Sequence, residues 1–367
     1  MNRIITQLEG TLLSCHLQQL TIETSYPNVT VAIYPQGSSK IFESTYYPNE
    51  DGIVVVHDIR TIFENFLERH QLALADFEVD VWHGEDEYEV VSADFSVLMC
   101  RLLMPREAID AIFLTAASSR RMAPDAFAPV AALLRNGEAR SYDMFVDYLC
   151  EGVAHRNEYM VGFPSLSLKG EVIATAKTSL YEMVQDLNYY FQHDPNNIVV
   201  RSFTMQCGAR SLTCYFDSSL AGRPTFYFIN SFGVVDSITL PAVTTAKQAV
   251  EQSEAVLANA VTIYDRTVEK TFEVQSDALT DDEMRLCEEL FASPCVRVSL
   301  KRNDLSRGFD FTALPQVLIT ESTCETSDGN EKPNSVKFTW RYADRLLRSH
   351  HAEENGPFSE PFNTIFS

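Results

Sequence analysis

The sequence predicts a mainly β protein of two to three tandem β-sandwich-like modules, each with one short helix. Three observations support this prediction. Apolar and polar residues alternate along many short segments, as in Val336–Tyr342, which is typical of antiparallel sheets with one buried face. Turn-forming residues, such as those of Asn49–Gly52 and Asn230–Gly233, separate these segments. A capped amphipathic helix between two strand-like segments recurs about every hundred residues, which indicates a repeated module.

The first module is predicted over residues 1–105. A strand at Ile53–Val56 leads into a helix at 58–70, in which apolar residues recur at helical spacing. We expect the carboxylate of Asp58 to cap the N-terminus of this helix. A second strand follows at Phe77–Trp82, so the helix connects two strands of the module.

The second module, predicted over residues 106–222, repeats this order with strands at Val172–Thr175 and Ile198–Met205. Between them, Ser179 and Glu182 have the spacing of a capping box, in which a hydroxyl and a carboxylate satisfy backbone N–H groups at the start of a helix. The pattern therefore predicts a helix that begins directly after Ser179.

The third module is predicted over residues 223–348. Its strands at Phe272–Val274 and Val296–Leu300 flank another capping-box pair, Thr280 and Glu283. This is the third occurrence of the same strand, helix and strand order. Duplication of this kind favours a scaffold over a catalyst.

The module boundaries are placed near Pro105 and near Gly222-Arg223-Pro224, where proline and glycine interrupt the strand-like segments. The Ala-rich segment Ala242–Val261 is interpreted as an additional helix inside the third module. Residues 349–367 are polar with spaced apolar residues, and they are predicted to form a tail or arm outside the modules.

Composition and charge narrow the class of protein. The chain of 367 residues is 45% hydrophobic and 22% charged, which suffices for a core in each module. Its formal net charge of −22 disfavours nucleic acid and anionic membranes, and it favours basic protein partners or cations. The sequence shows no secretory leader and no apolar run long enough to cross a bilayer, so we expect neither general secretion nor membrane insertion. The eight scattered cysteines are then expected to be free thiols.

No combination of residues predicts catalysis, a cofactor or a metal site. Nucleophile elbows and Gly-rich phosphate loops are absent from the sequence, and cysteines and histidines lack the spacing of zinc ligands. The densest acidic groups, Glu85–Glu87 and Asp281–Glu283, are interpreted as a hairpin tip and as first-turn charges favoured by the helix dipole. A glycan hydrolase would need two carboxylates that face each other across a cleft, and it is kept as an alternative.

Aromatic residues suggest another alternative. Tyr142, Phe145, Tyr148 and the run Phe226–Asn230 could line a platform for a sugar, but apolar runs of this kind suit buried strands. We interpret these residues as core, and we keep a host-surface glycan-binding module as an alternative function.

The candidate interface lies in the tail. Phe358, Phe362, Ile365 and Phe366 are apolar residues without an obvious local core, and we expect them to dock on a neighbouring subunit. No catalytic, cofactor-binding or metal-binding residue is predicted.

Three stretches, taken together and in order, resemble one group of phage proteins. They are Ile41–Pro48 leading into Gly52–Arg60, Phe226–Val234, and Pro315–Thr320 leading into Ser335–Tyr342. These stretches are similar to uncharacterised β-rich proteins encoded among the tail and baseplate genes of phages and prophages of gut anaerobes. The resemblance implies a component of a tailed-phage virion, made in the host cytoplasm, and it identifies no functional residue.

The residues and the resemblance together predict a non-enzymatic virion structural protein, associated with the tail or the baseplate. It would act by assembly with other virion subunits, as a homo- or hetero-oligomer, through exposed strand edges and loops. The alternatives are a host-surface glycan-binding module and a tail-associated glycan hydrolase.

Overall fold

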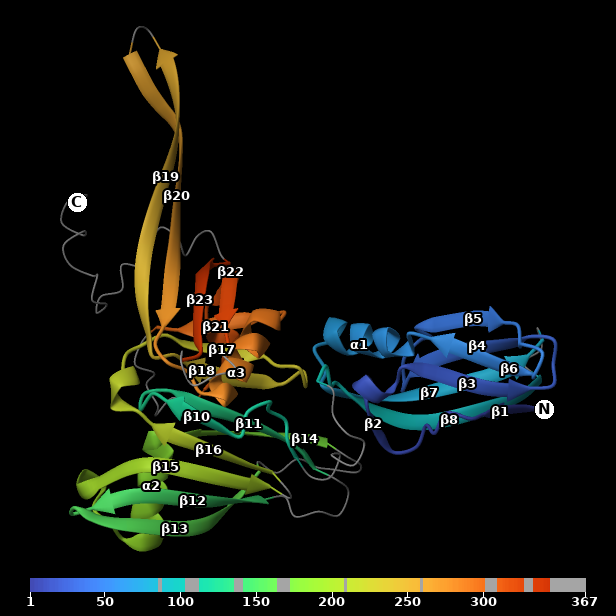
Figure 1. The fold of residues 1–367 in the computed structure, drawn as a ribbon, viewed down its shortest axis with the longest axis horizontal. Helices are drawn as coiled ribbons and strands as arrows, with labels where there is room; N and C mark the ends of the chain where they lie inside the picture. Colours follow the sequence, from blue (N-terminus) through green and yellow to red (C-terminus); the bar gives the residue numbers. More distant parts are fainter. Residues whose placement is uncertain are drawn as a thin grey trace.

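A computed structural model describes residues 1–84, 88–102, 112–134, 141–163, 172–207, 210–257, 260–300, 309–326 and 333–343. Figure 1 shows an N-terminal module at one end, central and C-terminal modules stacked on each other, and one long hairpin that projects from the C-terminal module. The strands of the three modules fall within residues 2–98, 112–216 and 225–342. The predicted mainly β fold class with sandwich-like modules is confirmed.

The N-terminal module has a three-stranded and a five-stranded sheet around one core. The first sheet has the order β1 (Asn2–Ile4), β3 (Gln19–Thr24), β6 (Ile53–His57), and the second has the order β2 (Thr11–Leu13), β8 (Tyr88–Leu98), β7 (Leu74–His83), β4 (Val29–Pro35), β5 (Phe42–Tyr46). Only the pair β2 and β8 is parallel among the described pairs of this module. Helix α1 (Ile59–Arg69) connects β6 to β7 and buries Phe63 and Leu67 in the core that both sheets share.

The central module repeats this topology strand for strand. Its sheets have the orders β9 (Ile112–Phe113), β11 (Phe127–Leu134), β14 (Val172–Ser179), and β10 (Ser119–Met122), β16 (Arg210–Phe216), β15 (Ile198–Cys207), β12 (Ser141–Cys150), β13 (Val153–Gly162). The pair β10 and β16 is again parallel, and helix α2 (Leu180–Phe191) connects β14 to β15. The two modules therefore represent a structural duplication of eight strands and one helix.

The C-terminal module shares only part of this topology. Its strands follow one order, β18 (Val235–Thr239), β17 (Thr225–Ile229), β21 (Val296–Ser299), β22 (Gln316–Glu325), β23 (Ser335–Tyr342), β20 (Ala260–Ser276), β19 (Ala242–Leu257). Helix α3 (Asp281–Ala292) connects β20 to β21, as α1 and α2 connect their strands. The hairpin β17–β18 and strands β21 and β22 correspond to β4–β5, β7 and β8, whereas β19 and β23 are additions. The predicted repeat thus holds around each helix but not across the whole third sheet.

Short 3₁₀ helices are also described. They are Ser14–His16, Pro195–Asn197, Ser218–Leu220 and Phe311–Ala313.

The three helix starts differ in their caps. Thr280 and Glu283 form the complete capping box predicted for α3. At α2, the Ser179 hydroxyl accepts a hydrogen bond from the Glu182 backbone N–H at 3.3 Å, which is the hydroxyl half of the predicted capping box. The predicted Asp58 cap is wrong, because this residue has a left-handed backbone (φ 58°) and its side chain makes no cap hydrogen bond. The Asp58 backbone N–H instead donates to the carbonyl of Gln18, the residue before β3, at 3.2 Å. This contact between two backbone segments, and not a side-chain cap, holds the start of α1 in place.

The helix predicted at Ala242–Val261 is wrong, because the described residues of this segment belong to β19 and to the beginning of β20. Strand β19 pairs in antiparallel register with β20 along its whole length, from Ala242 opposite Ser276 to Leu257 opposite Ala260. The β-branched residues Val243, Thr244 and Thr245 favour extended backbone locally. Pairing with a second long strand then outweighs the helix propensity of the alanines.

Several predictions concern residues outside the described ranges. The tail at 349–367, the predicted boundary at Pro105 and the acidic group Glu85–Glu87 all lie there. The seven cysteines whose side chains are described are free thiols.

Candidate assembly site

The turn between β17 and β18 brings all three modules together. Phe232 and Val234 in this turn are buried in one apolar cluster with Leu13 and Leu98 of the N-terminal module and with Leu133 of the central module. The Asn230 side-chain oxygen accepts from the backbone N–H of Phe232 at 3.0 Å and thereby shapes the turn. The β17–β18 turn of the C-terminal module is therefore inserted between the other two modules, and it is called the plug below.

The plug approaches the N-terminal module closely at Gly233. This residue has φ 73°, which glycine adopts without steric cost, and a Cβ built on it would lie 3.2 Å from the Cα of Ala73. The backbone N–H of Arg101 donates to the Ser231 carbonyl at 3.0 Å beside it. The position thus requires glycine both for its conformation and for its close approach to a neighbouring module.

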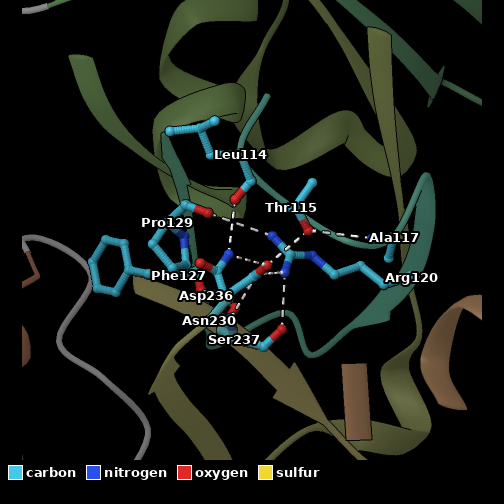
Figure 2. Close-up of polar contacts among 9 residues, drawn as sticks. All are labelled: Leu114, Thr115, Ala117, Arg120, Phe127, Pro129, Asn230, Asp236 and Ser237. Atoms are coloured by element: carbon cyan, nitrogen blue, oxygen red, sulfur yellow. Dashed lines mark hydrogen bonds and ion pairs between the residues drawn. The ribbon is translucent and has the colours of Figure 1, made fainter. Parts of the chain in front are cut away.

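A buried polar network joins the central module to the C-terminal module (Figure 2). Arg120 of β10 forms an ion pair with Asp236 of β18, and its guanidinium also donates to the Ser237 carbonyl at 2.9 Å. The second oxygen of Asp236 accepts from the Thr115 hydroxyl at 2.7 Å. Asn230 donates to the Leu114 carbonyl at 2.8 Å and closes the network. Each module therefore supplies groups that the other would leave unsatisfied.

The network compensates for the burial of the Arg120 charge. Burial alone would lower the pKa of Arg120, but the Asp236 carboxylate and the Cys214 thiol beside it raise that pKa above its usual range. Separation of the two modules would leave a buried charge without its counterion, and that is costly. The ion pair therefore favours a fixed arrangement of these two modules.

The first turn of α3 makes a second contact with the central module. One oxygen of Asp282 accepts from the backbone N–H and the hydroxyl of both Ser118 and Ser119, at 2.7 to 3.1 Å. Glu283 accepts from the Arg121 guanidinium at 2.7 and 2.6 Å in a bidentate pair. Burial raises the pKa of Asp282, but the serine hydrogen bonds outweigh it, so that pKa is lowered. The predicted first-turn charges are present, and they also bind a neighbouring module.

The hairpin of β19 and β20, called the arm below, projects from this rigid framework (Figure 1). Its strands have 16 and 17 residues, which corresponds to a length of roughly 50 Å. In the described structure β19 pairs only with β20, and β20 pairs with β23 only over Phe272–Gln275. Most of the arm is therefore a two-stranded ribbon with two unpaired edges.

Aromatic and charged side chains anchor the base of the arm. Phe272 stacks on the fully buried Trp340, with ring centroids 4.1 Å apart and planes 11° from parallel. Glu273 lies between Lys247 of β19 and Lys337 of β23, with 2.7 Å to the Lys337 ammonium nitrogen. Hydrogen bonds and charge from these two lysines lower the pKa of Glu273 to about 2. The arm is thus held in a defined direction at its base.

A second candidate surface is the outer face of the five-stranded sheet in the N-terminal module. A groove of about 510 Å³ is lined by the carboxylates of Asp76, Glu78 and Asp94, among other residues. Glu78 lies directly opposite Asp94 in the sheet, and Asp80, burial and Asp94 together raise the pKa of Glu78. This face gathers like charges, but no described group identifies a ligand for it.

The predicted site residues are only partly placed by the structure. Phe358, Phe362, Ile365 and Phe366 lie outside the described residues, so their role as an interface stays a prediction. Tyr142, Tyr148 and Phe226–Phe228 are buried, which agrees with the core interpretation and not with a sugar platform. The core interpretation is wrong for Phe145, which is half-buried on the opposite face of β12, with the Arg156 guanidinium 5.6 Å from its ring centroid.

The described residues show neither a metal-binding cluster nor a membrane-spanning helix. Within the described ranges, no group of three or more His, Cys, Asp or Glu side chains is arranged to hold a metal ion. None of the helices in the described part of the chain is long and apolar enough to span a membrane.

Sequence reasoning missed both the module junction and the arm. The junction residues Arg120 and Asp236 are 116 positions apart, and nothing local marks them as partners. The arm did leave a signal, because β-branched residues are frequent in Val243–Val250 and in the paired Val261–Val274.

Comparison with known proteins identifies no family. No family description matches the chain, and no curated protein matches it. The solved structures that align with part of this chain include the following three. The calcium-binding domain CBD12 of CALX1.1 aligns at 8% identity with a TM-score of 0.21, over 59% of this chain and all of that one. The fibronectin(III)-like modules of Clostridium thermocellum CbhA align at 11% identity with a TM-score of 0.17, over 59% of this chain and 94% of theirs. The polymeric Ig receptor ectodomain of a teleost fish aligns at 9% identity with a TM-score of 0.18, over 58% of this chain and 97% of that one.

These TM-scores are too low to bear on function. The class of the protein, a chain of β modules with a projecting hairpin, rests on its own strands and sheets.

Proposed function

We propose that the protein is a non-enzymatic structural subunit of a virion, associated with the tail or baseplate, and that the arm connects it to a neighbouring subunit. The single observation that carries this proposal is the arm itself. An isolated two-stranded ribbon is marginally stable in water, and its open edges present backbone N–H and C=O groups that another chain can pair with. A neighbouring strand or groove would supply the contacts that the arm lacks.

The rest of the framework supports a connecting role. The buried Arg120–Asp236 pair and the α3 contacts hold the central and C-terminal modules together, while Phe272 on Trp340 holds the base of the arm. A long arm transmits position only if its base is fixed. The assignment to a phage particle is supported by the resemblance of stretches such as Phe226–Val234 to tail and baseplate proteins.

An arm truncation tests the proposal. Replacing residues 249–269 with Asn-Gly keeps Gln248 opposite Lys270 and supplies the residues preferred in a two-residue hairpin turn. We expect the truncated protein to fold with a Tm close to that of the parent, because Phe272 and Glu273 are retained. We expect its incorporation into particles, and its concentration-dependent assembly by sedimentation, to be lost.

Two further variants serve as comparisons. Replacement of residues 258–259 alone with Asn-Gly keeps the length of the arm and is expected to preserve assembly. Deletion of residues 349–367 tests the predicted tail interface separately. Normal assembly of the protein in which Asn-Gly replaces residues 249–269 would show that the arm is not the connector.

A further inference from the structure

Exposed tyrosines gather on one side of α2 in the central module. Tyr189 and Tyr190 are 73% and 54% exposed, and their ring centroids are 5.0 Å apart with the planes almost perpendicular. Tyr190 also stacks against Tyr159 of β13, at 5.6 Å with an angle of 29° between the planes. Large exposed aromatic rings contribute strongly when a partner covers them. These rings therefore constitute a ready contact surface.

A carboxylate lies on the same side of the helix. Asp186 is three and four residues before Tyr189 and Tyr190, so the three side chains are neighbours on the helix surface. Glu182 precedes Asp186 by one further turn. Burial raises the pKa values of both carboxyl groups. Among the described residues, no ion pair of Asp186 is found, although a hydrogen bond with Tyr159 partly offsets the effect of burial on its pKa. The charge of Lys177 lowers the pKa of Glu182 against the effect of burial.

We propose that the patch formed by Asp186, Tyr189 and Tyr190, with Tyr190 stacked on the buried ring of Tyr159, binds an arginine side chain of a basic protein partner. A guanidinium is planar, stacks on a tyrosine ring and donates two parallel hydrogen bonds to a carboxylate. The patch offers both features within one turn of helix. An isolated ammonium or a neutral sugar would use only part of them.

Charge complementarity favours this occupant over a neutral glycan. The chain carries a net charge of −22, which draws basic partners and increases their rate of encounter. Asp186 then supplies a specific, half-buried carboxylate on the same side of the helix as the exposed rings. The patch lies in the central module, at the far side of the molecule from the arm (Figure 1). The proposal is therefore independent of the connector role of the arm.

Calorimetric titration of the full chain with a capped tetra-arginine peptide tests the proposal. We expect binding that weakens roughly tenfold in Tyr190→Ala and in Asp186→Asn, as loss of one cation–π or ion-pair contact predicts. Tyr190→Phe keeps the aromatic ring and should retain binding. Weaker binding in Tyr190→Ala, at an unchanged Tm, would then result from loss of the ring contact and not from loss of folding. Asp186→Asn should not lower the Tm at pH 7, because burial disfavours the charged form that the substitution removes.

Two control variants separate specific binding from attraction by net charge. Asp80→Asn removes the same charge in another module, and Tyr47→Ala removes a ring that is 76% exposed elsewhere. Neither should change the affinity more than twofold. An equal loss in Asp80→Asn would overturn the proposal, as would the absence of peptide binding. Binding of a neutral oligosaccharide such as cellotetraose that depends on Tyr190 would instead identify a glycan site and also overturn it.

Discussion

Arg120 of the central module and Asp236 of the C-terminal module form an ion pair in which the side chains are only 2% and 3% exposed. The pair is surrounded by hydrogen bonds from Thr115, Asn230 and Ser237. Removal of one member leaves a buried charge without its counterion, whereas removal of both members leaves no uncompensated charge.

We therefore expect Asp236→Ala to reduce the free energy of unfolding by about 3–5 kcal/mol, measured by chemical denaturation. Arg120→Met combined with Asp236→Ala should cost less than Asp236→Ala alone. Asp147→Ala is the matched control, because its pair with Arg156 is 3.7 Å long and exposed, and it should cost less than about 1 kcal/mol. Equal costs for Asp236→Ala and Asp147→Ala would show that the buried pair does not hold the modules together.

Gly233→Ala is expected to lower the stability of the protein by more than the strain of a left-handed backbone at alanine alone would. A left-handed backbone at alanine costs about 1–2 kcal/mol, and here the new Cβ would also press on Ala73. Gly222→Ala provides the comparison, because Gly222 has nearly the same φ of 74° with nothing within 4 Å of an added Cβ. The difference in Tm between the two variants measures the contact with the N-terminal module. If the two variants unfold alike, the close approach contributes nothing.

The base of the arm should loosen in acid. The folded-state pKa of Glu273 is lowered from its ordinary 4.5 to about 2, so its contribution to stability is present above pH 4.5 and is lost as the pH falls towards 2. The protection factors of the β19 and β20 amides, which correct for the slower intrinsic exchange in acid, should therefore fall between pH 5 and pH 2.5.

Glu273→Gln should remove this acid-dependent change, whereas Glu254→Gln, on the same arm and without a described ion-pair partner, should keep it. A parent-like profile in Glu273→Gln would assign the acid sensitivity to other groups.

The local sequence pattern was sufficient to predict the elements that depend on residues close to one another along the chain. Period-two alternation identified strands such as β7, β15 and β23, and the capping boxes at Ser179 and Thr280 located two helix starts. The recurrence of strand, helix and strand also revealed the duplication of the first two modules. These features follow from side-chain direction and from hydrogen bonds within a few residues, which the sequence by itself determines.

The tertiary structure decided what depends on partners far along the chain. Ala242–Leu257 is extended because β20 pairs with it, and the Asp58 backbone at the start of α1 binds the Gln18 carbonyl next to β3 while its side chain makes no cap. Arg120 meets Asp236 across 116 residues, and Asp282 meets Ser118 across 164 residues. Such pairings depend on how whole modules pack, because burial makes each polar group dependent on whichever group lies opposite it.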